Sequence, residues 1–390
     1  MGHHLGLGKP RYDRPHQGDN RRSRSAIAEV VSRRPVIRQL AEEREESLSP
    51  HARKSRLSRG RFREEEPCPI RTDFQRDRDR IIHSNSFRRL KHKTQVFVAP
   101  LGDHYVTRLT HTLEVSQIAR TIARALNLNE DLTEAISLGH DLGHTPFGHI
   151  GEEVLNDLYP AGFRHNEQSL RVIDHLENNG RGLNLTWEVR DGILNHSKTR
   201  AHILEEDWGE VGTLEGEVCR LSDIVAYVNH DTDDAIRAGV ITEGDLPLSA
   251  IRVLGLSRSA RINTLVSDII EYSWSVRVDT ASESRPAVGM SDPVLEATNT
   301  LREFLFTRVY DVHSSQEEAD QAKEIVRRLY EFFSKHGGKL PPEYRLRDED
   351  HQRQVVDYIA GMTDRYALRT AEEMSLVDDR ARQQRLFTDS

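Results

Sequence analysis

The chain has 390 residues, of which 36% are hydrophobic and 30% charged, and its mean hydropathy is −0.66. Its sequence holds no run near the roughly 18 apolar residues of a membrane-spanning helix, so we expect neither an integral membrane protein nor a membrane partner. No apolar segment follows the first methionine, which predicts a cytoplasmic rather than a secreted protein. The two cysteines, Cys68 and Cys219, are expected to be reduced thiols.

The charge is unevenly distributed along the chain. Residues 1–66 hold 16 Lys and Arg against 10 Asp and Glu, a net charge of +6, which leaves −14 for residues 67–390. A basic segment on an acidic body favours contact with an anionic partner such as single-stranded DNA or RNA, and a solvated tail is an equally good explanation. We expect residues 1–66 to form a flexible basic arm that carries one short helix near 27–40.

The remaining pattern is mostly helical. Ile81, Ile82, Phe87 and Leu90 fit one helix, and a short extended piece is expected at 94–98. Apolar residues at steps of three to five predict a long helix over 106–126. Further helices are predicted over 130–142, 170–176, 189–194, 218–228, 294–309, 317–333 and 352–371. One weak strand candidate, YSWSVRV, lies at 272–278.

These elements predict an all-α fold. The chain shows no sustained alternation of strands and helices and no G-x-x-x-x-G-K-[ST] motif, which disfavours Rossmann and P-loop architectures. We divide the chain into the basic arm (1–66), a helical core (67–240) and a helical C-terminal region (241–390). The last is expected to pack on the core and to contribute to an oligomer interface.

Histidine context, rather than histidine number, marks a candidate site. The chain has 19 histidines and two His-Asp pairs, about as many pairs as random order would give, so the dipeptide alone carries no signal. His140-Asp141 differs from the other pair because it ends an apolar helix between Gly139 and Gly143. Small residues at such a place let a metal ion or another backbone approach closely.

Two more polar residues interrupt apolar helices near this pair. His111 lies beside Leu109 and Leu113, and Asp223 lies in an otherwise apolar helix. A buried carboxylate costs several kcal/mol unless it is paired, hydrogen-bonded or bound to a metal. For each residue alone a satisfied core role is the better explanation, but His111, His140, Asp141 and Asp223 together predict a divalent metal site. Two imidazoles and two carboxylates suit Mn, Fe, Mg or Zn better than a soft metal.

The segment HDLGHTPFGHIGE (140–152) adds an acid–base candidate. If Pro146 lies near a helix start, His149 and Glu152 are three residues apart on one helix face. A carboxylate beside an imidazole orients the ring and raises its basicity, as a general acid or base requires. A surface ion pair is the alternative explanation.

Several ordered blocks carry a family resemblance: RTDFQRDRDRIIHSNSFRRLKHKTQVF (71–97), TRLTHTLEVSQIAR (107–120), HDLGHTPFGHIGE (140–152), FRHNEQSLRVIDHL (163–176), LSDIVAYVNHDTDDAI (221–236) and DYIAGMTDRYA (357–367). They resemble the HD-domain dNTP triphosphohydrolases, in particular the bacterial dGTP triphosphohydrolase-like proteins. The resemblance implies an HD catalytic core at 67–240. It also implies hydrolysis of dGTP or other dNTPs to deoxynucleoside and tripolyphosphate, by a metal-activated water that attacks the α-phosphorus.

The resemblance also implies roles for individual residues. The implied metal ligands are His111, His140, Asp141 and Asp223. The implied catalytic pair is His149 and Glu152, and the histidines implied to face the triphosphate are His144 and His165. The implied substrate contacts are Arg108 to phosphate, Tyr227 where a ribose 2′-OH would lie, Asp231 to the 3′-OH, and Arg89 in a sugar-side loop.

Partners and alternatives follow from the same resemblance. Relatives are tetramers or hexamers, some require a nucleotide activator and some bind single-stranded DNA, so we expect a homo-oligomer and leave activation and nucleic-acid binding open. One alternative is an HD phosphodiesterase or nucleotidase, which would share the metal site but would not need Tyr227 and Asp231. Another is a nucleic-acid-binding protein with a vestigial site, which the basic arm favours.

Overall fold

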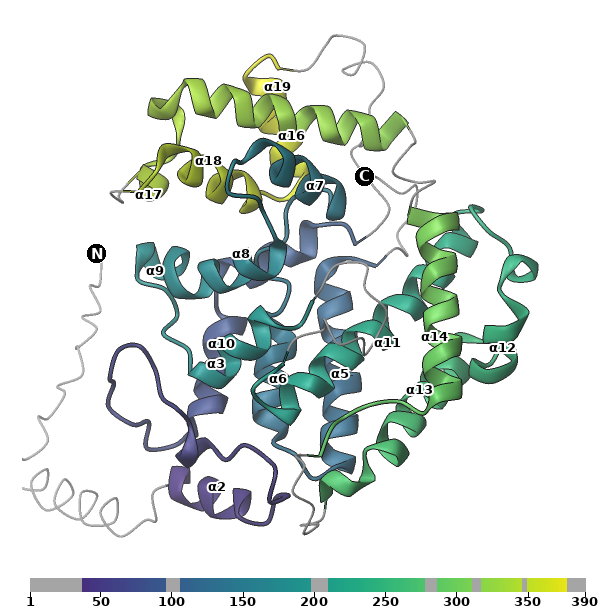
Figure 1. Ribbon diagram of the computed structural model, residues 1–390. Helices are drawn as coiled ribbons and strands as arrows, with labels where there is room; N and C mark the ends of the chain where they lie inside the picture. Colours follow the sequence, from purple (N-terminus) through teal and green to yellow (C-terminus); the bar gives the residue numbers. More distant parts are fainter. Residues whose placement is uncertain are drawn as a thin grey trace, which may run out of the picture.

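The fold was analysed in a computed structural model that describes residues 37–95, 106–197, 210–277, 286–310, 317–345 and 349–376 (Figure 1). Over these ranges the regular structure is helical, and the only β-type pairings are two isolated bridges, Arg61 with Thr186 and Thr94 with Thr107. The all-α prediction is therefore confirmed. Within the same ranges no helix is both long and apolar enough to cross a membrane.

The α-helices of the described residues fall into two groups along the chain. The first group is α2 (Ile37–Glu45), α3 (Asp73–Ile82), α4 (Asn85–Arg89), α5 (Arg108–Ala125), α6 (Glu130–Gly139), α7 (His149–Leu158), α8 (His165–Arg171), α9 (Glu177–Gly180), α10 (Trp187–Leu194) and α11 (Leu214–Arg237). The second group is α12 (Leu248–Leu254), α13 (Arg258–Tyr272), α14 (Asp292–Leu305), α16 (Glu317–Lys335), α17 (Pro342–Arg345), α18 (His351–Ala360) and α19 (Asp364–Glu373).

The larger hydrophobic core, which we call the main core, is built on α5, α6 and α11. Apolar residues at helical spacing, such as Ile118 and Ile122 on α5 and Leu132 and Ile136 on α6, are fully or almost fully buried against it. In Figure 1 these helices occupy the middle of the molecule, with α13 and α14 beside α11. The main core continues through α14 to Val309, so residues after 240 share it with the region that we predicted to be catalytic.

A second hydrophobic core, the C-terminal core, joins α7 to the last helices. Ile150, Val154 and Leu155 of α7 pack with apolar residues of α16, α18 and α19. Figure 1 shows α7 under α16 and apart from α5 and α11. The helix that carries His149 and Glu152 is therefore anchored in the C-terminal core, whereas α5, α6 and α11 belong to the main core.

Two buried charges connect the two cores. Lys93 donates from Nζ to the carbonyl oxygens of His144 and Ala360, the latter at 2.9 Å. Asp364, at the start of α19, accepts from the backbone N–H groups of Thr94 and Phe147, each at 2.9 Å. Burial, together with the nearby Arg89, lowers the pKa of Lys93 to about 7. These contacts hold the loop before α7 against the end of α18.

The segment 37–66, expected to be part of a flexible arm, instead packs on the main core. Its polar groups contact four acidic side chains that are less than 10% exposed: Glu45, Asp77, Glu188 and Glu215. Arg61 pairs with Asp77, and the backbone N–H of Arg59 donates to Glu188 at 2.9 Å. A charged segment such as this one is expected to be solvated, but here buried acidic side chains of the main core pair with its basic residues. Most of the helix expected near 27–40 lies outside the described residues.

Three local expectations differ from the structure. The strand expected at 272–278 is wrong, because α13 ends at Tyr272 and a 3-10 turn follows at Trp274–Arg277. The helix expected to run through Leu90 breaks after Ile82, where the Ser84 hydroxyl accepts from Phe87 N at 3.1 Å and starts α4. The helix expected over 352–371 is divided into α18 and α19. The extended piece expected at 94–98 lies mostly outside the described residues.

Removing Arg61 should unfold the docked segment. Arg61→Ala leaves the buried Asp77 unpaired, and we expect a loss of about 3–5 kcal/mol in the free energy of unfolding, measured by urea titration. The matched control is Arg56→Ala, which removes an ion pair between exposed side chains and should cost less than about 1 kcal/mol. Equal losses for the two variants would contradict the buried-pair explanation.

Glu215 should make stability depend on pH. Its Oε1 accepts from Arg53 N at 2.9 Å and Asn129 N at 3.1 Å, while its Oε2 has no hydrogen-bond partner in the described part of the chain. Burial raises the pKa of Glu215 to about 7, from 4.5 for an ordinary glutamate. The folded state therefore binds a proton that the unfolded state has lost, and this stabilisation disappears as pH rises from 4.5 through 7.

Glu215→Gln, which mimics the protonated side chain, should remove this dependence. We expect the variant to gain stability over the parent chain between pH 5 and pH 8, by up to about 3 kcal/mol. Urea unfolding of both proteins at pH 5, 6, 7 and 8 measures the difference, and parallel curves would show that Glu215 is not the group responsible.

Candidate active site

The four residues predicted as metal ligands converge from three helices of the main core. His111 comes from the first turn of α5, His140 and Asp141 follow α6, and Asp223 comes from α11. His111 Nε2 lies 3.3 Å from His140 Nε2 and 3.1 Å from Asp223 Oδ1. His140 Nε2 lies 3.6 Å from Asp141 Oδ1 and 3.9 Å from Asp223 Oδ1.

The hydrogen bond that each imidazole makes at Nδ1 indicates whether its Nε2 can act as an acceptor toward the cluster. His140 Nδ1 lies 2.7 Å from the Ser137 carbonyl oxygen, which can only accept, so Nδ1 carries the proton. His111 Nδ1 lies 2.9 Å from His230 Nε2, and His230 Nδ1 lies 2.7 Å from Asp231 Oδ1. Although burial opposes the shift, the Asp231 carboxylate raises the pKa of His230 and favours a proton on its Nδ1. In the neutral form of the His230 ring, Nε2 accepts from His111. Both Nε2 atoms of the cluster then present lone pairs to each other.

The two carboxylates of the cluster remain ionised. Burial alone would raise the pKa of Asp141, but the neighbouring His140 and Arg108 hold it well below its usual range. Burial alone would raise the pKa of Asp223, but the neighbouring imidazoles of His111, His140 and His196 together lower it to about 2. Facing imidazole lone pairs and ionised carboxylates in an apolar core need a cation, and this buried His/Asp cluster is compatible with a divalent metal.

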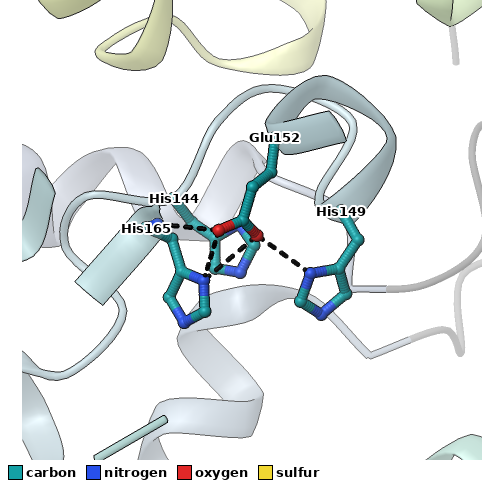
Figure 2. A group of neighbouring side chains, drawn as sticks. All are labelled: His144, His149, Glu152 and His165. Atoms are coloured by element: carbon teal, nitrogen blue, oxygen red, sulfur yellow. Dashed lines mark hydrogen bonds and ion pairs between the residues drawn. The ribbon is translucent and has the colours of Figure 1, made fainter. Parts of the chain in front are cut away.

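Glu152 is the centre of a second group of polar side chains beside the cluster (Figure 2). It accepts from His149 Nδ1 at 3.0 Å, from His165 N at 2.7 Å and from His165 Nδ1 at 2.9 Å. The His149 side chain is 71% exposed, whereas His165 is buried. The predicted pairing of His149 with Glu152 across one turn of α7 is therefore present. Although burial opposes both shifts, the pairing raises the pKa of His165 and lowers that of Glu152.

His144 completes this group. Its ring stacks on that of His165, with centroids 4.3 Å apart and planes at 15°. Burial, together with the charges of Arg108 and His165, lowers the pKa of His144 well below its usual range, so the ring is neutral. Its buried Nδ1 has no hydrogen-bond partner among the residues that the structure describes. A buried nitrogen without a partner is expected where a bound ligand or water supplies the missing hydrogen bond.

Gly143 is explained by backbone packing rather than by the metal. A Cβ there would lie 2.1 Å from Ser169 N and 2.7 Å from the His165 carbonyl oxygen, so only glycine lets α8 approach the loop that follows Asp141. The sequence left open whether the small residues around His140-Asp141 admit a metal ion or another backbone. At Gly143 it is another backbone. The close packing places His165 next to the cluster.

Arg108 lies at the start of α5, where the Thr107 hydroxyl caps the helix. Its Nη1 donates to Asp141 Oδ2 at 2.6 Å, and the side chain is almost fully buried. Arg108 Nε has no hydrogen-bond partner within the described ranges. The residue expected to contact phosphate thus holds a cluster carboxylate and keeps one unused donor.

The predicted sugar contacts occupy two places. Tyr227 and Asp231 follow Asp223 on successive turns of α11. Each is fixed by a hydrogen bond from a later helical segment: the Tyr227 hydroxyl accepts from Arg302 Nε, and Tyr310 OH donates to Asp231. The sequence held no signal for either partner, because 75 or more residues separate them from α11.

Arg89 lies apart from the His/Asp cluster. Its Nη1 donates to the Gly361 carbonyl oxygen at 3.2 Å. It lines a neighbouring cavity of about 260 Å³, together with Lys93, Gly143 and Tyr344. The cavity therefore reaches the back of the loop that follows Asp141.

Two histidines that we did not predict also belong to the site. His230 orients His111, as described above. His196 lies just after α10, with Nε2 3.2 Å from His165 Nε2 and 3.9 Å from Asp141 Oδ1. A histidine that closely follows the apolar helix at 189–194 was the only sequence signal for His196. In the second His-Asp pair, His230-Asp231, we had assigned a role to Asp231 alone.

An all-α core with a buried His/Asp cluster at its centre defines an HD-domain protein, and comparison with known proteins agrees. Residues 108–228 match the HD domain family, and residues 288–373 match the phosphohydrolase-associated domain family.

Relatives match over most of their length. A deoxyguanosinetriphosphate triphosphohydrolase-like protein from Caldanaerobacter subterraneus subsp. tengcongensis is 57% identical over 87% of this chain and 96% of its own. Proteins of the same name from Desulfatibacillum aliphaticivorans and Ralstonia nicotianae are 51% and 43% identical, each over 85% of this chain and over 96% and 95% of their own. The chain belongs to the family of deoxyguanosinetriphosphate triphosphohydrolase-like proteins. A solved structure of a hypothetical protein from Aquifex aeolicus has a TM-score of 0.44 and 19% identity, over 80% of this chain and 71% of that one.

Loss of His230 should weaken metal binding. His230→Ala removes the acceptor that orients His111, and we expect the affinity for Mn²⁺ to fall about 10- to 100-fold, measured by calorimetric titration of metal-stripped protein. His230→Gln keeps an acceptor oxygen and should retain more of the affinity. The exposed His175 provides the control, since His175→Gln should bind as the parent does. Unchanged affinity in His230→Ala would contradict the orienting role.

Proposed function

We propose that the protein hydrolyses deoxynucleoside triphosphates, dGTP among them, to the deoxynucleoside and tripolyphosphate. The observation that carries this proposal is the buried cluster of two imidazoles and two carboxylates directly beside the Glu152 group. The relatives' name, deoxyguanosinetriphosphate triphosphohydrolase-like protein, supports the substrate class.

The residues that would hold the metal are His111, His140, Asp141 and Asp223. Their nitrogen and oxygen donors suit Mn, Mg or Fe, and Zn also accepts such a set. When bound, a divalent metal lowers the pKa of a coordinated water toward about 7 and so supplies hydroxide at neutral pH. Arg108 keeps Asp141 ionised, and His230 keeps a lone pair of His111 directed at the site.

His149 is proposed as the general acid. In the reaction the oxygen of water forms a bond to the α-phosphorus, and the bond from the α-phosphorus to the deoxynucleoside 5′-oxygen breaks. That oxygen needs a proton, which the exposed imidazole of His149 can deliver from Nε2 while Nδ1 stays bonded to Glu152. The carboxylate stabilises the protonated ring before the transfer. The stacked His144 and His165 would line the triphosphate, and Arg108 Nε could donate to a phosphoryl oxygen.

Tyr227 and Asp231 would select the sugar. The Tyr227 ring, held by Arg302, would occupy the space of a ribose 2′-OH, and Asp231 would accept from the 3′-OH. A carboxylate has about four acceptor positions, so Asp231 keeps capacity beyond Tyr310. Arg89, which lines the neighbouring cavity, is assigned to the sugar side only by the family resemblance.

Other expectations stay predictions. They are the division at residues 66 and 240, a tetramer or hexamer, a nucleotide activator, binding of single-stranded DNA or RNA, and a cytoplasmic location. Asp223, Tyr227 and Asp231 are spaced four residues apart on α11, and this spacing favours the triphosphohydrolase over an HD phosphodiesterase or nucleotidase.

A substrate panel tests the proposed reaction. Each dNTP, the matching ribonucleotides and dGMP are incubated with the protein and Mn²⁺ or Mg²⁺, and the products are separated by chromatography. We expect deoxynucleoside and tripolyphosphate from dNTPs only. If dNTPs react in mixtures but not singly, the reaction stands and an activator is required. Stepwise release of phosphate, or hydrolysis of ribonucleotides alone, would contradict the proposal and favour the general HD phosphatase.

Variants in the same assay assign the roles. Asp223→Asn should abolish hydrolysis, and His149→Gln should lower kcat by about 10²- to 10⁴-fold while metal binding is retained. His175→Gln is the matched control and should keep full activity. Full activity in His149→Gln would remove it as the general acid.

A further inference from the structure

Asp364 connects two segments that lie beside the candidate active site. It is the first residue of α19, where an acid favours the helix dipole even when it is exposed, yet its side chain is only 4% exposed and contacts other parts of the chain. Oδ1 accepts from Phe147 N at 2.9 Å, and Oδ2 accepts from Thr94 N at 2.9 Å and from the Thr94 hydroxyl at 2.8 Å. One buried carboxylate therefore fixes both the loop before His149 and the segment at Thr94.

The turn formed by Phe147 and Gly148 determines where α7 begins. His149 is the first residue of α7 (Figure 2), and Gly148 at the N-cap position offers no side chain to cap the helix. Both turn residues have a positive φ, 60° at Phe147 and 61° at Gly148. A left-handed backbone is unfavourable for a residue with a bulky side chain, so Phe147 must be held by its surroundings. Its ring is buried in the C-terminal core, and its N–H donates to Asp364.

We propose that Asp364 is a positioning residue for the proton donor: its Oδ1 holds the strained turn, and the turn sets where the His149 ring lies relative to the His/Asp cluster. The inference rests on the proposed function, in which His149 Nε2 gives its proton to the deoxynucleoside 5′-oxygen as the bond from that oxygen to the α-phosphorus breaks. Asp364 acts on His149 through the backbone of Phe147 and Gly148. A displacement of a reacting group by about 1 Å can cost about 10²-fold in rate.

Asp364→Asn tests this role with little change in shape. The amide has one acceptor oxygen, which keeps two hydrogen bonds if it faces Thr94 and one if it faces Phe147. We therefore expect the variant to keep its contact with Thr94 and to place its NH₂ group against the Phe147 N–H, which releases the turn. The matched control is Asp350→Asn, because Asp350 is exposed and caps the neighbouring helix α18.

A double-mutant cycle with dGTP separates positioning from a general loss of structure. We expect kcat to fall about 10- to 100-fold in Asp364→Asn with KM nearly unchanged, and to stay at the parent value in Asp350→Asn. In the background of His149→Gln, Asp364→Asn should have almost no further effect, because the group that it positions is already absent. Equal losses in the two backgrounds would overturn the positioning role and leave the proposed function standing.

Hydrogen exchange tests the turn without reference to activity. By mass spectrometry, the Phe147 amide should exchange slowly in the parent and in Asp350→Asn, and faster in Asp364→Asn. A parent that hydrolyses no dNTP would overturn the proposed function, and unchanged exchange in Asp364→Asn would overturn the role of Asp364 in holding the turn. If Asp364→Asn fails to fold, as judged by thermal melting, rapid exchange of the Phe147 amide in the parent would overturn that role, and slow exchange would support it.

Discussion

The buried His111, His140 and Asp141 and the partly exposed Asp223 bring two ionised carboxylates and two imidazole nitrogens 3.3 Å apart together in a largely apolar core, and the rest of the structure depends on keeping them there. An apolar interior cannot solvate such charge, so three of the four groups are fixed by a partner outside the cluster. Ser137 holds the ring of His140, His230 holds that of His111, and Arg108 neutralises Asp141. The helices α5, α6 and α11 bring these partners together by burying their apolar faces against one another.

Much of this arrangement could be predicted from the sequence, for a physical reason. Polar residues inside apolar helices conflict with the pattern around them, so Asp223 and His140 were conspicuous. Residues three apart, such as His149 and Glu152, lie on the same face of a helix, and the structure shows the predicted contact between them. Helix periodicity also predicted the fold class, since it reports which face of each helix is buried.

What could not be predicted depends on partners distant in the chain. His196 and His230 carry little local signal, because they contribute through contacts with His165 and His111 in other helices. The segment 37–66 has the composition of a solvated arm, and only the buried acids of α3, α10 and α11 make it part of the fold. The run at 272–278 alternates as a strand does, yet it has no neighbouring strand within the described residues and forms a 3-10 turn instead.

The division of the site between two hydrophobic cores has a mechanical consequence. The His/Asp cluster is built on α5, α6 and α11, whereas His149 lies on α7, which packs with the last helices, and Lys93 and Asp364 connect the two cores. A force or a ligand that tilts the C-terminal helices would reorient His149, the proposed proton donor, without disturbing the cluster. We therefore expect proton donation and metal retention to be separable, so that a change at the C-terminal end slows the first while it spares the second.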